Sequence, residues 1–294
     1  MPDIIILGTI GIDRLKTPFG KAENVLGGSA VYAAYAASFF SKPGIISVKG
    51  EDLEEKELHF LKEKGVSLEG VKTKGKNFRW AGEYGKDMNE AKTISTEINS
   101  LADFQPDTPE TYKNAKYLFM ANIDPEMQLK VMNSVKAPEL IVTDTMDYWI
   151  KNKKEKVMEA ISKSDILILN DQEAKALFQE QNLVKAAKKA LQAGLKAVII
   201  KKGEHGSLLF TKNEHFSCPG YPLENATDPT GCGDSFGGAF IGHYSKSRDI
   251  RKAIVYASVI ASFNAEGFGL ENLKKISHED IEKRYKEMIA LRSF

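Results

Sequence analysis

The most informative string in this sequence is Asp228-Pro229-Thr230-Gly231-Cys232-Gly233-Asp234-Ser235-Phe236-Gly237-Gly238-Ala239-Phe240, a glycine-rich turn that leads into a helix. Glycines at 231 and 233 permit positive φ angles, which turn successive backbone N–H groups to one side. Because a helix N-terminus also carries partial positive charge, the string predicts an anion hole that suits a phosphate. Asp234 falls in the first helical turn, and with an ordinary pKa of about 3.9 it would be ionised at neutral pH. An ionised carboxylate beside a phosphate site can accept the proton of an attacking hydroxyl.

The same string has a plainer explanation, in which Asp234 only caps a helix that follows a glycine turn. The string is not the dinucleotide-binding pattern G-x-G-x-x-G, because Phe236 stands where the third glycine belongs. The chain also contains no G-x-x-x-x-G-K-[ST] motif, so a Walker-type nucleotide site is unsupported.

Outside this string, apolar runs of strand length alternate with amphipathic segments of helical length. Strands are expected at 4–7, 44–48, 117–120, 140–142, 166–169 and 197–200. Amphipathic helices are expected at 52–64, 125–135, 153–162, 171–178 and 183–193. The alternation predicts an α/β fold over residues 1–294, one domain with a doubly wound, mostly parallel sheet flanked by helices.

Two segments, 13–26 and 71–104, interrupt this alternation with polar and aromatic residues. They are predicted to be β-hairpin inserts. Polar, aromatic inserts on an α/β core suit a lid, which is wet when open and excludes water when closed. An edge sheet or a dimer surface would explain the same residues.

The composition excludes several classes of protein. The 294 residues carry 41 basic and 40 acidic side chains, and this balance gives no electrostatic footprint for nucleic acid. Two cysteines cannot make a disulfide framework, and the five histidines lack the spacing of a zinc site. The N-terminus reads as a first strand rather than a signal peptide, and no stretch suits a bilayer span, so we expect a cytoplasmic protein without membrane partners.

A second candidate site follows the predicted strand 166–169. Asn170 and Glu173 stand three residues apart at a helix start, where an amide and a carboxylate could hold the water shell of a phosphate-bound magnesium. A helix-capping pair would look the same locally.

Two further candidates lie near other strand ends. The segment Lys201-Lys202-Gly203-Glu204-His205-Gly206 follows a strand, and its glycines and lysines suit a phosphate ligand as well as they suit an exposed turn. Near the N-terminus, the Gly27-Gly28 pair could hinge a lid, and Asp13 could accept hydrogen bonds from ligand hydroxyls.

Taken together, T-G-C-G-D-S-F, N-x-x-E, the early Gly-Gly pair and the two inserts resemble the ribokinase/PfkB family of carbohydrate and nucleoside kinases. The match follows the whole chain in order. The resemblance implies a doubly wound α/β core with a β-rich lid. It also implies transfer of the γ-phosphoryl group of magnesium-ATP to a hydroxyl.

The resemblance also implies roles for individual residues. Asp234 would be the base, and the backbone amides of Gly231, Cys232 and Gly233 would stabilise the transferring phosphoryl group. Nucleotide and magnesium contacts are implied for Asn170, Glu173 (through water to magnesium), Lys202, Gly203, Gly206 and, more loosely, Asn264 near the adenine. Acceptor contacts are implied for Asp13, Gly27, Gly28 and Arg79. Asp228 and Thr230 match a monovalent-cation site, with activation by potassium left open.

Three departures from the family pattern concern the acceptor and the anion hole. Tyr32 replaces an asparagine that often contacts a sugar hydroxyl, and Asp144-Thr145-Met146-Asp147-Tyr148 lacks the D-x-N-x-R pattern of kinases for keto-deoxy sugar acids. Cys232 replaces a small residue, which leaves a redox sensitivity open. In the segment 78–84, Arg79 could meet the acceptor, whereas Phe78 and Trp80 could stack on it or simply form lid core.

We therefore predict an ATP- and magnesium-dependent kinase that phosphorylates a hydroxyl of a sugar or sugar-like molecule. A nucleoside kinase of the same fold and a catalytically silent ligand-binding regulator are the alternatives. The sequence leaves open whether the protein is a monomer or a homodimer.

Overall fold

The computed structural model describes residues 1–291, whose apolar strand segments assemble into a nine-stranded main sheet. The strand order is β13-β12-β11-β10-β9-β8-β1-β4-β5. The strands from β5 to β11 run parallel, and β12 and β13 add antiparallel pairs at one edge. Their bounds are β1 Ile4–Leu7, β4 Gly44–Lys49, β5 Ser67–Thr73, β8 Tyr117–Met120, β9 Leu140–Asp144, β10 Ile166–Asn170, β11 Ala197–Lys201, β12 Ser207–Thr211 and β13 His215–Cys218.

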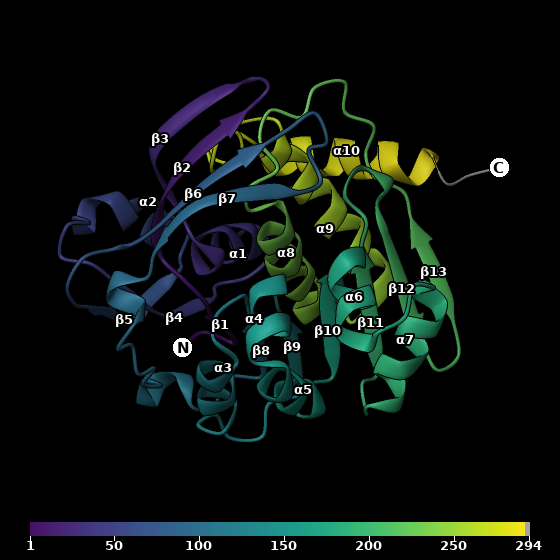
Figure 1. Cartoon of the computed structure of the whole chain (residues 1–294), viewed down its shortest axis with the longest axis horizontal. Helices are drawn as coiled ribbons and strands as arrows, with labels where there is room; N and C mark the ends of the chain where they lie inside the picture. Colours follow the sequence, from purple (N-terminus) through teal and green to yellow (C-terminus); the bar gives the residue numbers. More distant parts are fainter. Residues whose placement is uncertain (292–294) are drawn as a thin grey trace.

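Helices cover both faces of the main sheet, because its strands are apolar on both sides. Ile4 and Ile6 of β1 pack into one core with α1, α8, α9 and α10, whereas Ile5 and Leu7 pack into another with α3 and α5. Figure 1 shows α3, α4, α5, α6 and α7 on the near side of the sheet. The helices are α1 Ser29–Ser38, α2 His59–Glu63, α3 Pro125–Met132, α4 Asp147–Asn152, α5 Lys154–Ser162, α6 Asp171–Phe178, α7 Leu183–Gln192, α8 Cys232–Ser247, α9 Ile250–Ala265 and α10 His278–Ala290. The predicted α/β architecture is confirmed.

A second sheet has the order β3-β2-β6-β7 and lies above α1 at the upper left of Figure 1. Its strands are β2 Gly11–Thr17, β3 Gly20–Gly27, β6 Phe78–Tyr84 and β7 Ala91–Glu97. The hairpins β2–β3 and β6–β7 fall in the two predicted inserts, and β2 joins them by pairing in parallel with β6. Residues 71–73 of the second insert belong to β5 of the main sheet instead.

The prediction of a helix over 52–64 is wrong for the first half of this range. A 3₁₀ turn, η1 Glu55–Leu58, precedes the short α2, and three other 3₁₀ turns are η2 Asn99–Leu101, η3 Glu110–Tyr112 and η4 Gly203–His205. Asp52 cannot start a helix because its carboxylate accepts hydrogen bonds from Asn77 and forms an ion pair with Arg79. Contacts distant in sequence therefore outweigh the local helical periodicity.

Candidate active site

Three polar residues end adjacent parallel strands on the same side of the main sheet. Asp144 ends β9, Asn170 ends β10 and Lys201 ends β11. Each lies two residues beyond an apolar residue of the core that contains α8, namely Val142, Ile168 and Ile199, listed here in the same order. Because strand side chains alternate between faces, Asp144 and Lys201 project toward the α8 face, whereas the Asn170 Oδ1 accepts from the Glu173 N–H at the start of α6. The Lys201 Nζ lies 3.0 Å from the Asp144 Oδ2.

The N-terminus of α8 meets this group of side chains. Gly231 takes the left-handed conformation (φ 75°) and precedes the helix without any side-chain cap. Only glycine fits there, because a Cβ atom would overlap the ring of Tyr32. The helix therefore begins with backbone N–H groups that no capping side chain covers, which is the arrangement of an anion site.

Asn264 of α9 holds the glycine turn in place. Its Nδ2 donates to the carbonyl oxygen of Thr230 at 2.8 Å, and its Oδ1 accepts from the hydroxyl of Ser235 at 3.2 Å. The residue is only 1% exposed. Both ends of its amide thus brace the turn, and its suggested position near the adenine stays a prediction.

Asp234 lies in the first turn of α8, and burial raises its pKa to about 7. The carboxylate of Asp144 contributes to this rise in pKa, whereas the ammonium of Lys201 opposes it. The expectation that Asp234 has an ordinary pKa is wrong, because the loss of water outweighs the favourable helix terminus. A carboxyl group that titrates near neutral pH is well matched to accepting a proton.

Cys232 also has a perturbed acidity. Burial raises the pKa of its thiol to about 12, against an ordinary value of 9.0. The Asn264 Nδ2 lies 3.4 Å from the sulfur, which in turn faces the carbonyl oxygen of Ala261 at 3.5 Å. A thiol that stays protonated is a poor target for oxidants, so the redox sensitivity left open above finds no support here.

Asp13 of β2 brings a second carboxylate to the core. A methyl group on Gly27 would overlap the Asp13 carboxylate, so the two residues lie in contact. Burial, together with the nearby carboxylates of Asp228 and Asp234, raises the pKa of Asp13 to about 8. The structure thus brings Asp13, Gly27 and Asp234 into one acidic region.

Tyr32 lies between Asp13 and the glycine turn. Its ring packs against Gly231, and the residue is 1% exposed. Within residues 1–291, its buried hydroxyl has no hydrogen-bond partner. Because burying an unpaired hydroxyl is costly, such a group calls for a partner that the protein alone does not supply.

The small sheet turns an aromatic face toward the same region. In the β2–β6 register, Trp80 pairs with Asp13 and Phe78 pairs with Gly11, so these side chains share the face of Asp13. Arg79 pairs with Ile12 on the other face, and its guanidinium Nη2 lies 3.0 Å from the Asp52 Oδ2. Arg79 therefore pairs with Asp52 and does not lie with the site carboxylates Asp13 and Asp234.

Asp228 and Thr230, the suggested monovalent-cation residues, hold the turn through their own hydrogen bonds. The Asp228 carboxylate accepts from the backbone N–H groups of Thr230 (3.0 Å) and Gly269 (3.3 Å). The Thr230 hydroxyl donates to the Tyr84 hydroxyl of β6 at 3.2 Å. Over the described part of the chain, no group of three or more His, Cys, Asp or Glu side chains is arranged to hold a metal ion.

Asn170 and Glu173 form a capping box at the start of α6. The Asn170 Oδ1 accepts from the Glu173 N–H and the Glu173 Oε2 accepts from the Asn170 N–H, each at 2.7 Å. Burial raises the pKa of Glu173 to about 8, although Lys201 opposes the shift. The capping alternative is therefore realised, in a place next to the carboxylates of the site.

The predicted glycine turn after β11 lies beside the loop that joins β6 to β7. The Lys202 N–H donates to the carbonyl oxygen of Gly206 at 2.7 Å, which closes the turn. A Cβ atom on Gly203 would overlap the side-chain oxygen of Asn89. On the opposite side of the site, Gly28 precedes α1 with φ 97°.

Sequence reasoning missed Asp144 and Lys201 as site residues. It weighed Asp144 only as part of an unmatched motif, and it selected Lys202 over Lys201. The period-2 alternation of the strands, extended by two residues past Val142 and Ile199, would have placed both side chains on the α8 face.

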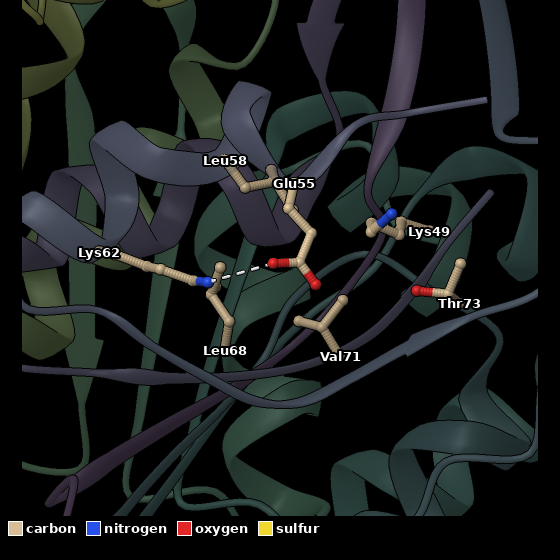
Figure 2. Close-up of a pocket in the computed structure, with 7 residues that line it drawn as sticks. All are labelled: Lys49, Glu55, Leu58, Lys62, Leu68, Val71 and Thr73. Carbon is tan, nitrogen blue, oxygen red and sulfur yellow. Dashed lines mark ion pairs between the residues drawn. The ribbon is translucent and has the colours of Figure 1, made fainter. Parts of the chain in front are cut away.

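A hollow of about 100 Å³ lies apart from these residues, between η1, α2 and β5. Figure 2 shows that Glu55 and Lys62 face each other across it, 3.7 Å apart. Both side chains are at least half exposed, so the pair is an ordinary surface ion pair.

Comparison with known proteins identifies the family. Residues 13–276 match the family model described as pfkB family carbohydrate kinase. The chain belongs to this family. Its members are phosphotransferases with an alcohol group as acceptor, and this chain is accordingly a sugar or nucleoside kinase.

Relatives of both acceptor classes are similar to the chain. A cytidine kinase of Thermococcus kodakarensis is 28% identical over 261 residues, which cover 86% of this chain and 92% of that protein. The structure of Arabidopsis thaliana ribokinase complexed with ribose and ATP has a TM-score of 0.78 at 20% identity and covers 97% of this chain and 99% of that one. The structure of a Burkholderia thailandensis nucleoside kinase in complex with inosine has a TM-score of 0.76 at 18% identity and covers 98% of each chain. Among residues 1–291, the helices include none with the length and apolar character that a membrane crossing requires.

Proposed function

We propose that this protein transfers the γ-phosphoryl group of magnesium-ATP to a hydroxyl of a sugar or sugar-like molecule, with Asp234 as the base. The observation that carries the proposal is the N-terminus of α8, which places a carboxyl group with a pKa of about 7 in the same turn as backbone amides that no side chain caps. Phosphoryl transfer mainly needs positioning and charge stabilisation, and this turn offers both.

In the proposed reaction, the acceptor hydroxyl loses its proton to Asp234 as its oxygen bonds to the γ-phosphorus. The bond from the γ-phosphorus to the bridging oxygen of ADP breaks, and ADP leaves with the electron pair. The amides of Gly231, Cys232 and Gly233 stabilise the charge on the transferring group. Magnesium, when bound, would neutralise the ATP phosphates, with Asn170 and Glu173 beside its water shell.

The nucleotide side of the site would include the turn from Lys202 to Gly206. Its glycines allow the backbone to approach a ligand closely, and Lys202 could steady phosphate charge. Potassium remains a separate proposal at Asp228 and Thr230, where the carboxylate is fully buried next to the α8 turn.

The acceptor side would be formed by Asp13, Gly27, Gly28 and Tyr32. A polyhydroxylated ligand would donate to the Asp13 carboxylate and would offer a partner to the unpaired Tyr32 hydroxyl. Such hydrogen bonds relieve the cost of burying both groups.

We propose that the small sheet, from the inserts 13–26 and 71–104, acts as the lid of this single domain. Polar side chains of this sheet already contact the core. The Thr17 hydroxyl donates to the carbonyl oxygen of Thr227 at 2.9 Å, Tyr84 bonds to Thr230, and Asn89 touches Gly203. Closure of this kind excludes water, which otherwise competes as the phosphoryl acceptor.

A nucleoside acceptor is the second candidate. The aromatic face formed by Phe78 and Trp80 suits stacking on a base, and relatives of this chain include the cytidine kinase. In this version the ribose would occupy the Asp13 side and the base would lie against the small sheet.

An assay of ADP release from magnesium-ATP separates these candidates. The wild-type protein is tested with ribose, other sugars, polyols, cytidine and inosine, with and without potassium. Turnover with sugars supports the leading proposal, whereas turnover restricted to nucleosides supports the second candidate. Measurable binding of ATP and acceptor without any turnover would contradict both and would indicate a silent regulator.

A further inference from the structure

Lys201 stands at the anion hole without a role in the reaction as described so far. It is the last residue of β11, and its side chain is 18% exposed. An atom placed at the Cβ position of Gly233 would lie 3.0 Å from the Lys201 Nζ. The ammonium therefore occupies the space directly beside the first turn of α8.

Charged neighbours keep this lysine protonated. Burial alone would lower the pKa of Lys201, but the carboxylates of Asp144, Glu173 and Asp234 outweigh burial and raise it above its ordinary value. The contact with Asp144 also fixes the ammonium at 3.0 Å from a group that burial makes immobile. A held, charged donor of this kind is suited to meet a phosphate oxygen.

Among residues 1–291, Lys201 is the only cation whose charge shifts the pKa of Asp234. The groups that act on Asp234 are Asp144 and Lys201, and those that act on Asp13 are Asp228 and Asp234. A phosphoryl group that enters the hole would therefore approach several carboxylates and this ammonium. Without a nearby cation, repulsion from the carboxylates would oppose the charge that develops during transfer.

We propose that Lys201 is a catalytic residue, whose ammonium contacts the transferring phosphoryl group beside the α8 amides, and that Asp144 is the positioning residue that holds it there. This inference rests on the proposed function, because it requires a phosphoryl group in the α8 hole. Lys201 forms no covalent bond in the reaction; it donates a charge-assisted hydrogen bond that strengthens as the phosphoryl charge redistributes.

A binding experiment tests the inference without knowledge of the acceptor. Isothermal calorimetry compares the affinity for magnesium-ADP alone with that for magnesium-ADP plus aluminium fluoride, which mimics the transferring phosphoryl group. The variants are Lys201→Met and Lys201→Arg. The matched control is Lys196→Met, which removes an exposed lysine paired with Asp165 immediately before the N-terminal end of the same strand.

Wild type and Lys196→Met should bind the aluminium fluoride complex more tightly than ADP alone. In Lys201→Met, ADP affinity should change less than about threefold, while the gain from aluminium fluoride falls about 100-fold. Lys201→Arg, which keeps the charge, should recover part of the gain in affinity from aluminium fluoride. Such a recovery would show that the loss in Lys201→Met does not come from misfolding. A full aluminium fluoride gain in Lys201→Met, or equal losses for ADP and the mimic, would overturn the proposal.

Turnover with the acceptor found in the panel gives a second readout. Lys201→Met should lower kcat about 100-fold with little change in the KM for ATP, and Asp144→Asn should lower kcat less, again without a change in KM. If wild type turns over no acceptor in the panel, the proposed function fails, whereas the aluminium fluoride comparison still decides the role of Lys201.

Discussion

The N-termini of α6 and α8 lie in the same site, yet only the α6 terminus has a side-chain cap. At α6, Asn170 and Glu173 form a capping box that satisfies each other's backbone N–H groups. At α8, Gly231 supplies no side-chain cap and takes the left-handed conformation, and the Cys232 N–H that follows donates to the carbonyl oxygen of Pro229 at 3.1 Å. The sequence marks the start of each helix: α6 follows a strand without glycine, and α8 follows a glycine-rich turn.

This difference shows how the protein separates structure from ligand binding. A capped terminus is stable without a ligand, whereas an uncapped buried terminus needs an anion to satisfy its amides. The α6 terminus therefore forms a rigid boundary of the site. The α8 terminus is the place where binding of a phosphoryl group is most favourable. The predictions below test this contrast.

The largest effect is expected for Gly231→Ala. Alanine at this position must adopt a left-handed backbone conformation, and its methyl group overlaps the ring of Tyr32. The free energy of unfolding should therefore fall by about 2–4 kcal/mol. Turnover should fall at least about 100-fold, because the open amides move. Urea unfolding and ADP release measure the two effects.

Gly75→Ala is the matched control for this variant. Gly75 also has a positive φ, of 59°, but a Cβ atom there meets nothing within 4 Å. It should lose only about 1–2 kcal/mol and keep full turnover. Equal losses in the two variants would contradict a special role for the α8 turn.

A smaller effect is expected for Asn170→Ala, which opens the capping box of α6. Loss of the cap should cost about 1 kcal/mol. Asn182→Ala is the control, since Asn182 caps α7 by accepting from the N–H groups of Val184 and Lys185. If Asn170 also orders the magnesium shell, its variant should lose about tenfold more turnover than the control. Identical turnover in the two variants would restrict Asn170 to capping.

A separate effect concerns pH and the ligand-free protein. Burial raises the pKa of Asp13 and Glu173 to about 8 and that of Asp234 to about 7, so the folded state holds more protons than the unfolded state at neutral pH. Unfolding then releases protons, and the free energy of unfolding should fall as pH rises from about 6.5 to 8.5.

Urea unfolding at several pH values checks this slope, and Asp13→Asn or Asp234→Asn should make it shallower. A wild-type stability that stays flat or rises across the same window would contradict raised pKa values for these carboxyl groups in the folded protein.

Most of the fold follows from the sequence, because apolar runs and amphipathic periods are local signals. The strands predicted at 140–142, 166–169 and 197–200 all form, but each continues to a polar residue, Asp144, Asn170 or Lys201. An apolar-run criterion stops where polarity begins, and at these strands polarity begins at the site. Asp234 and the glycine turn are identified by a different local signal, the glycine-rich motif itself.

The electrostatic state of the site could not be predicted in the same way. The pKa of Asp234 depends on Asp144 and Lys201, which are 90 and 33 positions away in the sequence. The ion pair of Arg79 with Asp52 likewise joins two segments with no shared local pattern. Burial and charge pairing are properties of the assembled site, whereas the sequence shows only which residue types are available.

The central claim is that Asp234 acts as the base at the α8 hole. The most direct measurement compares ADP release by wild type and Asp234→Asn, with the acceptor found in the panel, alongside calorimetric binding of magnesium-ADP. The account predicts that turnover falls at least about 100-fold while nucleotide affinity is retained. A variant that turns over as fast as wild type would contradict it.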